Sequence, residues 1–198
     1  MASGQAQRRG LQSSKPALRS DGENLLHAES VGTLPNAAVA RVVGELAIAS
    51  RETIIDVGEA TWAGAPSEGA FQNYWRGVLL APHRHLILGR VDGRVAGALQ
   101  LVRQGQFSEL GSDVFELKDF FIAPWAQGIG LAPMLLHKSD EVADAEGAAM
   151  INLSVRATRL RAIAVFEAAG FKRWGEKADY AKLGDRFVPG YFYSKSFG

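Results

Sequence analysis

The stretch DFFIAPWAQGIGLAPMLL, residues 119–136, joins a short apolar strand to a helix through a Pro turn and a Gly-rich loop. Within it, Gln127, Gly130 and Ala132 follow the pattern Q-x-x-G-x-A, and Gly128 is a further glycine. Glycines let the backbone turn tightly and leave amide N–H groups uncovered by side chains. A helix that begins there adds unpaired N–H groups and a partial positive charge. The stretch therefore predicts a seat for a phosphate or diphosphate group.

Two common phosphate-binding motifs do not fit this loop. A P-loop requires Lys-Ser or Lys-Thr after its last glycine, where this chain has Leu131 and Ala132. A dinucleotide fingerprint requires a third glycine, where this chain has Pro133, and it occurs at the first turn of a βαβ unit. Two interpretations remain. In one, the loop binds another phosphate-bearing ligand; in the other, it is a Gly-rich strand-to-helix turn that binds no ligand.

The composition is that of a soluble globular protein. The chain has 198 residues, of which 47% are hydrophobic and 22% charged, which is enough for one domain with a sizeable core. A net charge of +1 gives no reason to expect a nucleic-acid or membrane partner. The lack of cysteine excludes disulfides, thiolate metal sites and a Cys nucleophile, and the four His residues are scattered, so we expect no metal.

The N-terminal segment differs in composition from the rest of the chain. Residues 1–22 are rich in Ser, Gly, Gln and basic residues and contain no apolar core of the kind that a secretory signal needs. We expect a disordered tail here, with a basic targeting arm as the alternative. Residues 23–198 are expected to form a single domain, and the protein is expected to be cytoplasmic because no apolar run is long enough to span a bilayer.

The order of the expected elements indicates a mixed sheet with helices on both faces. Strands are expected at residues 24–31, 85–91, 94–102, 114–123, 150–155, 171–183 and 186–197. Helices are expected at residues 33–50, 68–80, 130–146 and 158–169, and residues 53–70 are expected to be largely loop. Asp92-Gly93 is a strong hairpin signal. The strand–helix–strand unit across 114–155 predicts two parallel neighbours joined by a right-handed crossover.

Three segments in this order resemble the GCN5-related N-acetyltransferase (GNAT) superfamily. They are DFFIAP with the following Q-x-x-G-x-A loop, the strand INLSV at 151–155, and AIAVFEAAGF at 162–171. The resemblance covers roughly residues 24–197, and its specific part is 114–172. It implies an α/β (α+β) fold with a mixed, mostly antiparallel twisted sheet, a splayed parallel strand pair and helices on both faces. It also implies acetyl-CoA, or coenzyme A, as the acyl donor ligand.

The resemblance assigns the donor site to particular residues. In the family, pantetheine lies between the two splayed parallel strands and the Gly-rich loop holds the diphosphate. The implied coenzyme A-binding residues are Phe120, Phe121, Ile122, Gln127, Gly128, Ile129, Gly130, Leu131, Ala132 and Phe166. The backbone N–H near Ile122 is expected to polarise the thioester carbonyl, a role that any residue type can fill.

Glu116 is the expected catalytic base. Acyl transfer to an amine requires a group that accepts the proton of the amine. Glu116 lies where resembling histone acetyltransferases carry a glutamate, whereas the glutamate position of polyamine acetyltransferases is Lys118 here. Strand alternation is expected to place Glu116, Lys118 and Phe120 on one face, and Asp119 on the other as a structural hydrogen-bonding group. The alternatives are an exposed Glu116–Lys118 ion pair of no catalytic role, or a histidine base at His83 or His85.

The residue at the position of the family's general acid differs in this chain. Many relatives place a Tyr where this chain has Phe166, and an Asn where it has Arg159. Phe166 has no proton to give, so the departing thiolate is expected to collect its proton from water or from a tyrosine near the closing strands. Those tyrosines are Tyr180, Tyr191 and Tyr193.

The acceptor is expected to be an amine of a small molecule or peptide, bound between the first two helices and the last strands. Candidate wall residues are the aromatic Trp62, Phe71, Tyr74 and Trp75 and the acidic Asp56, Glu59 and Glu68, with core packing as the alternative for the aromatics. Trp125 is expected either to contact the ligand or to brace the turn. The resemblance also allows a homodimer, a protein amino group as acceptor, or a domain that binds acyl-CoA without efficient turnover.

Overall fold

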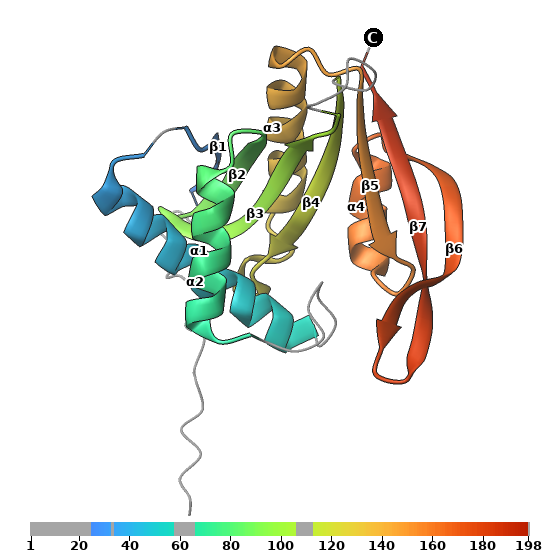
Figure 1. Cartoon of the computed structure of the whole chain (residues 1–198), viewed down its shortest axis with the longest axis horizontal. Helices are drawn as coiled ribbons and strands as arrows, with labels where there is room; N and C mark the ends of the chain where they lie inside the picture. Colours follow the sequence, from blue (N-terminus) through green and yellow to red (C-terminus); the bar gives the residue numbers. More distant parts are fainter. Residues whose placement is uncertain (1–24, 33, 58–65, 106–112, 198) are drawn as a thin grey trace, which may run out of the picture.

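A single seven-stranded sheet organises the protein. The computed structural model describes residues 25–32, 34–57, 66–105 and 113–197, so the expected tail over residues 1–22 lies outside the described part. The strands follow the order β1-β2-β3-β4-β5-β7-β6 across the sheet (Figure 1). Their bounds are β1 Leu26–Ser30, β2 Arg84–Val91, β3 Arg94–Arg103, β4 Val114–Ile122, β5 Met150–Arg156, β6 Lys172–Leu183 and β7 Arg186–Ser196. Within the described ranges, no helix is both long and apolar enough to cross a membrane.

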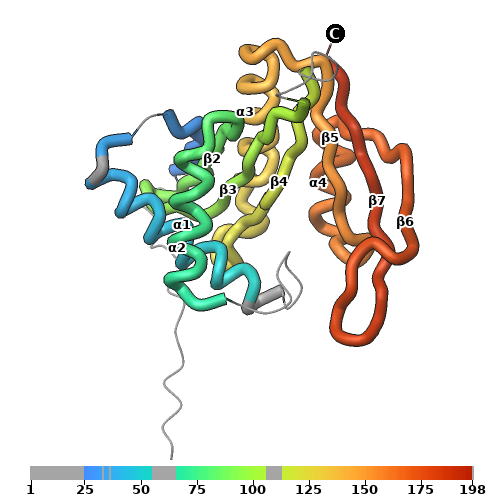
Figure 2. The backbone as a smooth tube through the Cα atoms, viewed as in Figure 1, coloured from blue at the N-terminus to red at the C-terminus, as the bar shows by residue number. Residues whose placement is uncertain are grey.

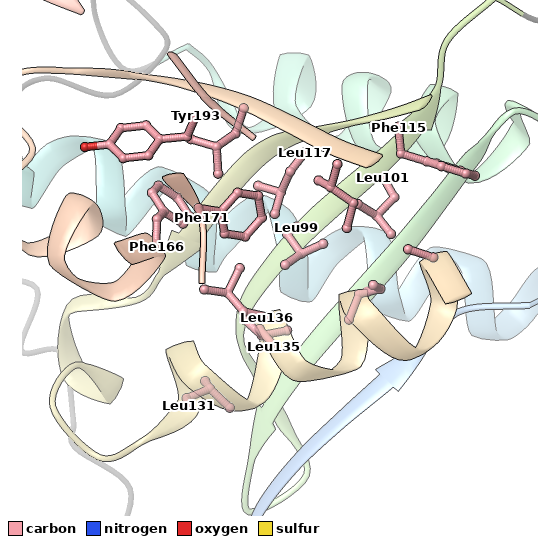
Figure 3. Packing of buried hydrophobic residues seen from close by; sticks show 14 of the residues in the cluster. Leu99, Leu101, Phe115, Leu117, Leu131, Leu135, Leu136, Phe166, Phe171 and Tyr193 are labelled. Atoms are coloured by element: carbon pink, nitrogen blue, oxygen red, sulfur yellow. The ribbon is translucent and has the colours of Figure 1, made fainter. Parts of the chain in front are cut away.

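Helices cover both faces of the sheet, as the sequence predicts. The helices are α1 Asn36–Val57, α2 Glu68–Leu80, α3 Leu131–Ala145 and α4 Leu160–Ala168, with a short 3-10 turn η1 at Pro124–Ala126. We call the side that α1 and α2 cover the α2 face, and the side that α3 and α4 cover the α4 face (Figure 1). Each face has its own hydrophobic core, and the core of the α4 face joins α3 and α4 to the sheet (Figure 3).

The boundary of α1 corrects one prediction. Residues 53–70 were expected to be largely loop, but α1 continues through Thr53 to Val57. The Thr53 hydroxyl donates to the carbonyl of Ala49 one turn earlier, and Ile54 is buried in the core of the α2 face. Burial of Ile54 outweighs the weak helix propensity of these β-branched residues. The part of the expected loop at residues 58–65 lies outside the described residues.

The parallel pair β4–β5 is confirmed, and it is short. Only three residue pairs join the two strands, from Val114 opposite Met150 to Glu116 opposite Asn152. Beyond these pairs the strands diverge, while β4 stays paired with β3 and β5 stays paired with β7 (Figures 1 and 2). The edge of β4 that faces β5 therefore has no strand partner from Leu117 to Ile122, within the described chain. We call this opening the splay.

A β-bulge in β4 lies beside the splay and corrects the expected alternation. Leu99 of β3 stands opposite two residues of β4, Asp119 and Phe120, because the register shifts between Gln100 and Ala98. Asp119 has a φ of 50°, in the left-handed region that Asp tolerates better than most residues. Phe120 therefore packs on the α4 face and Phe121 on the α2 face.

The predicted grouping of side chains on β4 was accordingly wrong in two places. Glu116 and Lys118 share the α2 face, opposite the buried Phe115 and Leu117 of the α4-face core, but Phe120 does not join them. Asp119, expected on the other face, bonds to α2 instead. A single extra residue reverses the alternation for everything that follows it.

Candidate functional site

The Gly-rich loop turns directly into α3. Gly128 has a φ of 78° and Gly130 a φ of 92°, a region that strains any residue with a side chain. Gly130 is the N-cap of α3, and no side chain of the described residues makes a capping hydrogen bond there. The side chain of Gln127 donates to the carbonyl of Ile122 at 3.5 Å, which ties the loop to the end of β4. The loop and the splay thus form one continuous site.

A diphosphate group fits the space above this loop. A Cβ atom on Gly128 would meet nothing within 4 Å, and one on Gly130 would meet only Leu26 at 3.8 Å among the described residues. The first turn of α3, all of it described, contains no acidic residue that would repel an anion. Open space, uncapped amide groups and the positive end of the α3 dipole favour a bound anion. The predicted diphosphate-binding residues Gln127, Gly128, Ile129, Gly130, Leu131 and Ala132 form this loop and the start of α3.

The aromatic residues at the splay divide between the two faces. The Phe120 and Phe166 rings lie 5.2 Å apart, so β4 and α4 meet on the α4 face of the opening. Phe166 is buried and also contacts Phe171. Phe121 instead approaches the Trp75 ring at 6.0 Å on the α2 face. The structure therefore brings Phe120 and Phe166 together and places Phe121 across the strand from them.

Glu116 stands at the closed end of the splay, at the last residue pair between β4 and β5. Its carboxylate lies 3.0 Å from Lys118 Nζ and accepts a hydrogen bond of 3.2 Å from the side-chain amide of Gln104. About a third of its side chain is exposed. The carboxylate is therefore reachable from the α2 face, and the expected ion pair with Lys118 is present.

A hydrogen-bonded network that the sequence analysis missed lies at the bulge. The Tyr74 hydroxyl of α2 donates to the Asp119 carboxylate, and Gln100 Nε2 donates to the same oxygen at 2.7 Å. Arg84 donates to Gln100 Oε1 at 2.8 Å. Burial, with the nearby Asp119 carboxylate, raises the pKa of Tyr74 well above its ordinary value. These hydrogen bonds hold α2 against the bulge. In the sequence, the one residue property that points to the bulge is that Asp tolerates a positive φ.

The candidate proton donors and acceptors differ in where they point. Tyr193 donates to Glu167 of α4 at 2.9 Å, and burial with this contact raises the pKa of Tyr193 to about 12. Arg173 lies over the Tyr191 ring at 3.5 Å. His85 contacts Phe115 and Glu146, near the end of α3 that is remote from the Gly-rich loop. The Tyr193 hydroxyl is therefore held by α4, and His85 lies at the far end of α3 from the loop.

The side chains expected to form the acceptor wall differ in their exposure. Phe71 and Trp75 are buried in the core of the α2 face, so for these two the packing alternative holds. Glu68 is exposed and bonds to Gln72 on its own helix. Trp62 and Glu59, and the side chain of Asp56, lie outside the described residues.

Two further side chains border the loop. Trp125 lies under the Arg94 guanidinium at 4.8 Å and donates to Glu52 at 3.2 Å, so it braces the turn against α1 and β3. Arg161, on the first turn of α4, donates to Gln127 at 3.3 Å. Arg161 therefore brings a positive charge from α4 to the Gly-rich loop. No sequence pattern pointed to it, because the contact joins residues distant in the chain.

A hollow adjoins the closed end of the splay. It has a volume of about 560 Å³ and is lined in part by Asn152, Trp174 and Ser194. Asn152 accepts a hydrogen bond of 2.6 Å from Ser194 and is the residue that pairs with Glu116. Among the described residues no group of His, Asp and Glu side chains has the arrangement of a metal site.

The amino-acid sequence matches a family model and a curated relative. The family model described as acetyltransferase (GNAT) family matches residues 52–171. An uncharacterized N-acetyltransferase encoded in the hisH-hisA intergenic region of Azospirillum brasilense is 40% identical over 100 residues. That alignment spans 50% of this chain and 60% of the relative.

Solved structures share the architecture at low sequence identity. An acetyltransferase of the GNAT family from Streptococcus pneumoniae superposes with a TM-score of 0.71 at 16% identity, covering 88% of this chain and 100% of that chain. A Salmonella typhimurium protein, yncA, whose structure holds its cofactor acetyl-CoA, gives a TM-score of 0.65 at 14% identity, with 86% and 93% covered. These structures show the fold that the splay and the loop belong to.

Proposed function

This chain belongs to the GNAT acetyltransferase family, and we propose that it transfers the acetyl group of acetyl-CoA directly to a primary amine of a small molecule or peptide. The observation that carries the proposal is the continuity of the splay with the Gly-rich loop through the Gln127–Ile122 contact. A ligand with an extended amide-bearing arm and a diphosphate group matches a strand edge without a partner that leads to an uncapped helix N-terminus.

The donor-binding residues would act mainly through the backbone. The free edge of β4 at Phe120, Phe121 and Ile122 would pair with the amide groups of the pantetheine arm, replacing the hydrogen bonds that β5 does not supply. A backbone N–H near Ile122 would hold the thioester oxygen as negative charge develops on it. Phe120 and Phe166 would pack along the arm on the α4 face. Residues 127–132 would hold the diphosphate.

Glu116 would accept the proton of the attacking amine. It is a partly exposed carboxylate at the closed end of the splay, on the face opposite Phe120, and its strand partner is Asn152, which lines the hollow. An amine that enters from the α2 face would meet this carboxylate before it reaches the thioester. Lys118 and Gln104 would hold the carboxylate in place.

Acetyl transfer is tested by thiol release. We expect the protein to release free coenzyme A from acetyl-CoA in the presence of at least one compound from a panel of primary amines, polyamines and short peptides with free amino groups. The measurement is the absorbance of a thiol reagent, with product mass as the check. Tight acetyl-CoA binding without thiol release on any acceptor would favour a domain that binds acyl-CoA without turnover.

The loop assignment is tested by Gly130→Asp. The new carboxylate would occupy the open space above the loop and repel the diphosphate, so the Kd for acetyl-CoA is expected to rise at least about tenfold. Gly147→Asp is the matched control, since Gly147 also has a positive φ but follows the other end of α3. Both variants carry similar backbone strain, and calorimetric titration that finds equal affinities for the two would refute the assignment.

The base is tested by Glu116→Gln, which keeps the shape of the side chain and removes its basicity. General base catalysis typically contributes about 100-fold or more, so kcat should fall by that order and depend less on rising pH. The Kd for acetyl-CoA should stay within about twofold. Glu141→Gln, at an exposed carboxylate on α3, is the control. A pH–rate profile identical to that of the wild type would remove Glu116 from the mechanism.

A further inference from the structure

The outermost strand β6 contains an irregularity that is unusual in its size. Lys177 pairs with Gly190 of β7, and the next pair is Ala181 with Val188. Three residues of β6, at 178–180, therefore stand opposite the single residue Pro189 of β7. Two extra residues bend the strand and re-aim the side chain at the end of the bulge, which is Tyr180.

Tyr180 reaches across β7 through a gap that only glycine leaves. A Cβ atom on Gly190 would lie 2.2 Å from Cγ and 2.4 Å from Cδ1 of the Tyr180 ring. No other residue fits at this position without displacing the ring, since real Cβ atoms do not approach carbon this closely. The ring is further held edge-to-face against Phe192 at 5.9 Å. The position of the Tyr180 ring is therefore fixed by the bulge in β6 and by Gly190 and Phe192 of β7.

The hydroxyl of Tyr180 reaches β5, the strand on the other side of β7 from β6. It lies 2.8 Å from the Ser154 hydroxyl of β5. Ser154 is two residues beyond Asn152, where pairing between β4 and β5 ends. It alternates with Ile151 and Leu153, which are buried in the α4-face core, so Ser154 faces the α2 side. Tyr180 therefore brings a phenolic hydroxyl to the β5 arm of the splay, on the face that carries Glu116.

The other tyrosines make different contacts. Tyr74 donates to Asp119, Tyr193 donates to Glu167 on the α4 face, and Tyr191 lies against Arg173. Phe166 is aromatic but carries no proton. Of the four tyrosines in the chain, all described, Tyr180 is the one whose hydroxyl bonds to the β5 arm of the splay, whereas the Tyr74 hydroxyl donates its proton to the Asp119 carboxylate on β4.

We propose that Tyr180 is the proton donor to the departing coenzyme A thiolate, an assignment that rests on the proposed acetyl transfer. A phenol keeps its proton at neutral pH and is a good hydrogen-bond donor to sulfur that becomes negative. Ser154 acts as a positioning residue: its hydroxyl holds the phenol at the β5 arm and donates to the phenolate after transfer. Gly190 is the residue that makes the approach possible.

The proton balance of the step is complete. The amine nitrogen forms a bond to the thioester carbon, the carbon–sulfur bond breaks, and its electron pair stays on sulfur. Glu116 takes the proton that the nitrogen loses and passes it to water. Tyr180 gives its proton to sulfur, and water restores it. The products are an amide and a free thiol.

The test titrates the thiol of bound coenzyme A, so it requires no acceptor. Thiolate absorbance in the ultraviolet is followed against pH for wild type and for Tyr180→Phe, which keeps the ring above Gly190. A hydrogen bond from Tyr180 stabilises the thiolate, so the bound thiol should titrate about one pH unit higher in Tyr180→Phe. The Kd for coenzyme A at neutral pH should stay within about twofold.

Turnover supplies the second readout, with any acceptor found active. Tyr180→Phe should lower kcat at neutral pH about tenfold or more. Tyr191→Phe, on the neighbouring strand, is the matched control and should match wild type in both measurements. Equal thiol titrations for wild type and Tyr180→Phe would overturn the proposal for Tyr180. Failure of the wild type to bind coenzyme A would instead overturn the proposed function.

Discussion

The separation of β4 from β5 is the constraint on which the rest of the structure depends. Three residue pairs hold the strands together, and beyond Glu116 each strand follows its other neighbour. The bulge at Asp119 lies beside this separation and turns Phe120 toward α4 and Phe121 toward α2. A strand edge without partners is costly in a folded protein unless water or a ligand completes its hydrogen bonds. The separation therefore both costs stability and creates the site.

The two sides of the opening are built in different ways. The donor side uses backbone groups, two glycines with positive φ and the start of α3, which a short local motif encodes. The opposite side uses side chains from elements distant in sequence: Tyr74 from α2 at the bulge, Glu116 from β4, and Tyr180 from the outermost strand.

The sequence predicted the features that local chemistry determines. The Asp92-Gly93 hairpin, the parallel crossover and the loop before α3 follow from turn residues and periodicity, and the structure has all three. It did not predict the bulge at Asp119, since one extra residue leaves no mark in an apolar strand. The end of α1 was misjudged because burial of Ile54 outweighs propensity. Contacts such as Arg161–Gln127 and Ser154–Tyr180 depend on tertiary structure alone.

The most direct test of the account is amide hydrogen exchange with and without acetyl-CoA. If the splay and the loop seat the donor, acetyl-CoA should slow exchange about tenfold or more in residues 118–122 and 127–132, where its amides and diphosphate would pair with the backbone. The hairpin of β2 and β3 away from the splay should change little. Protection confined to other elements, or the same small change everywhere, would contradict the assignment of the donor to the space between β4 and β5.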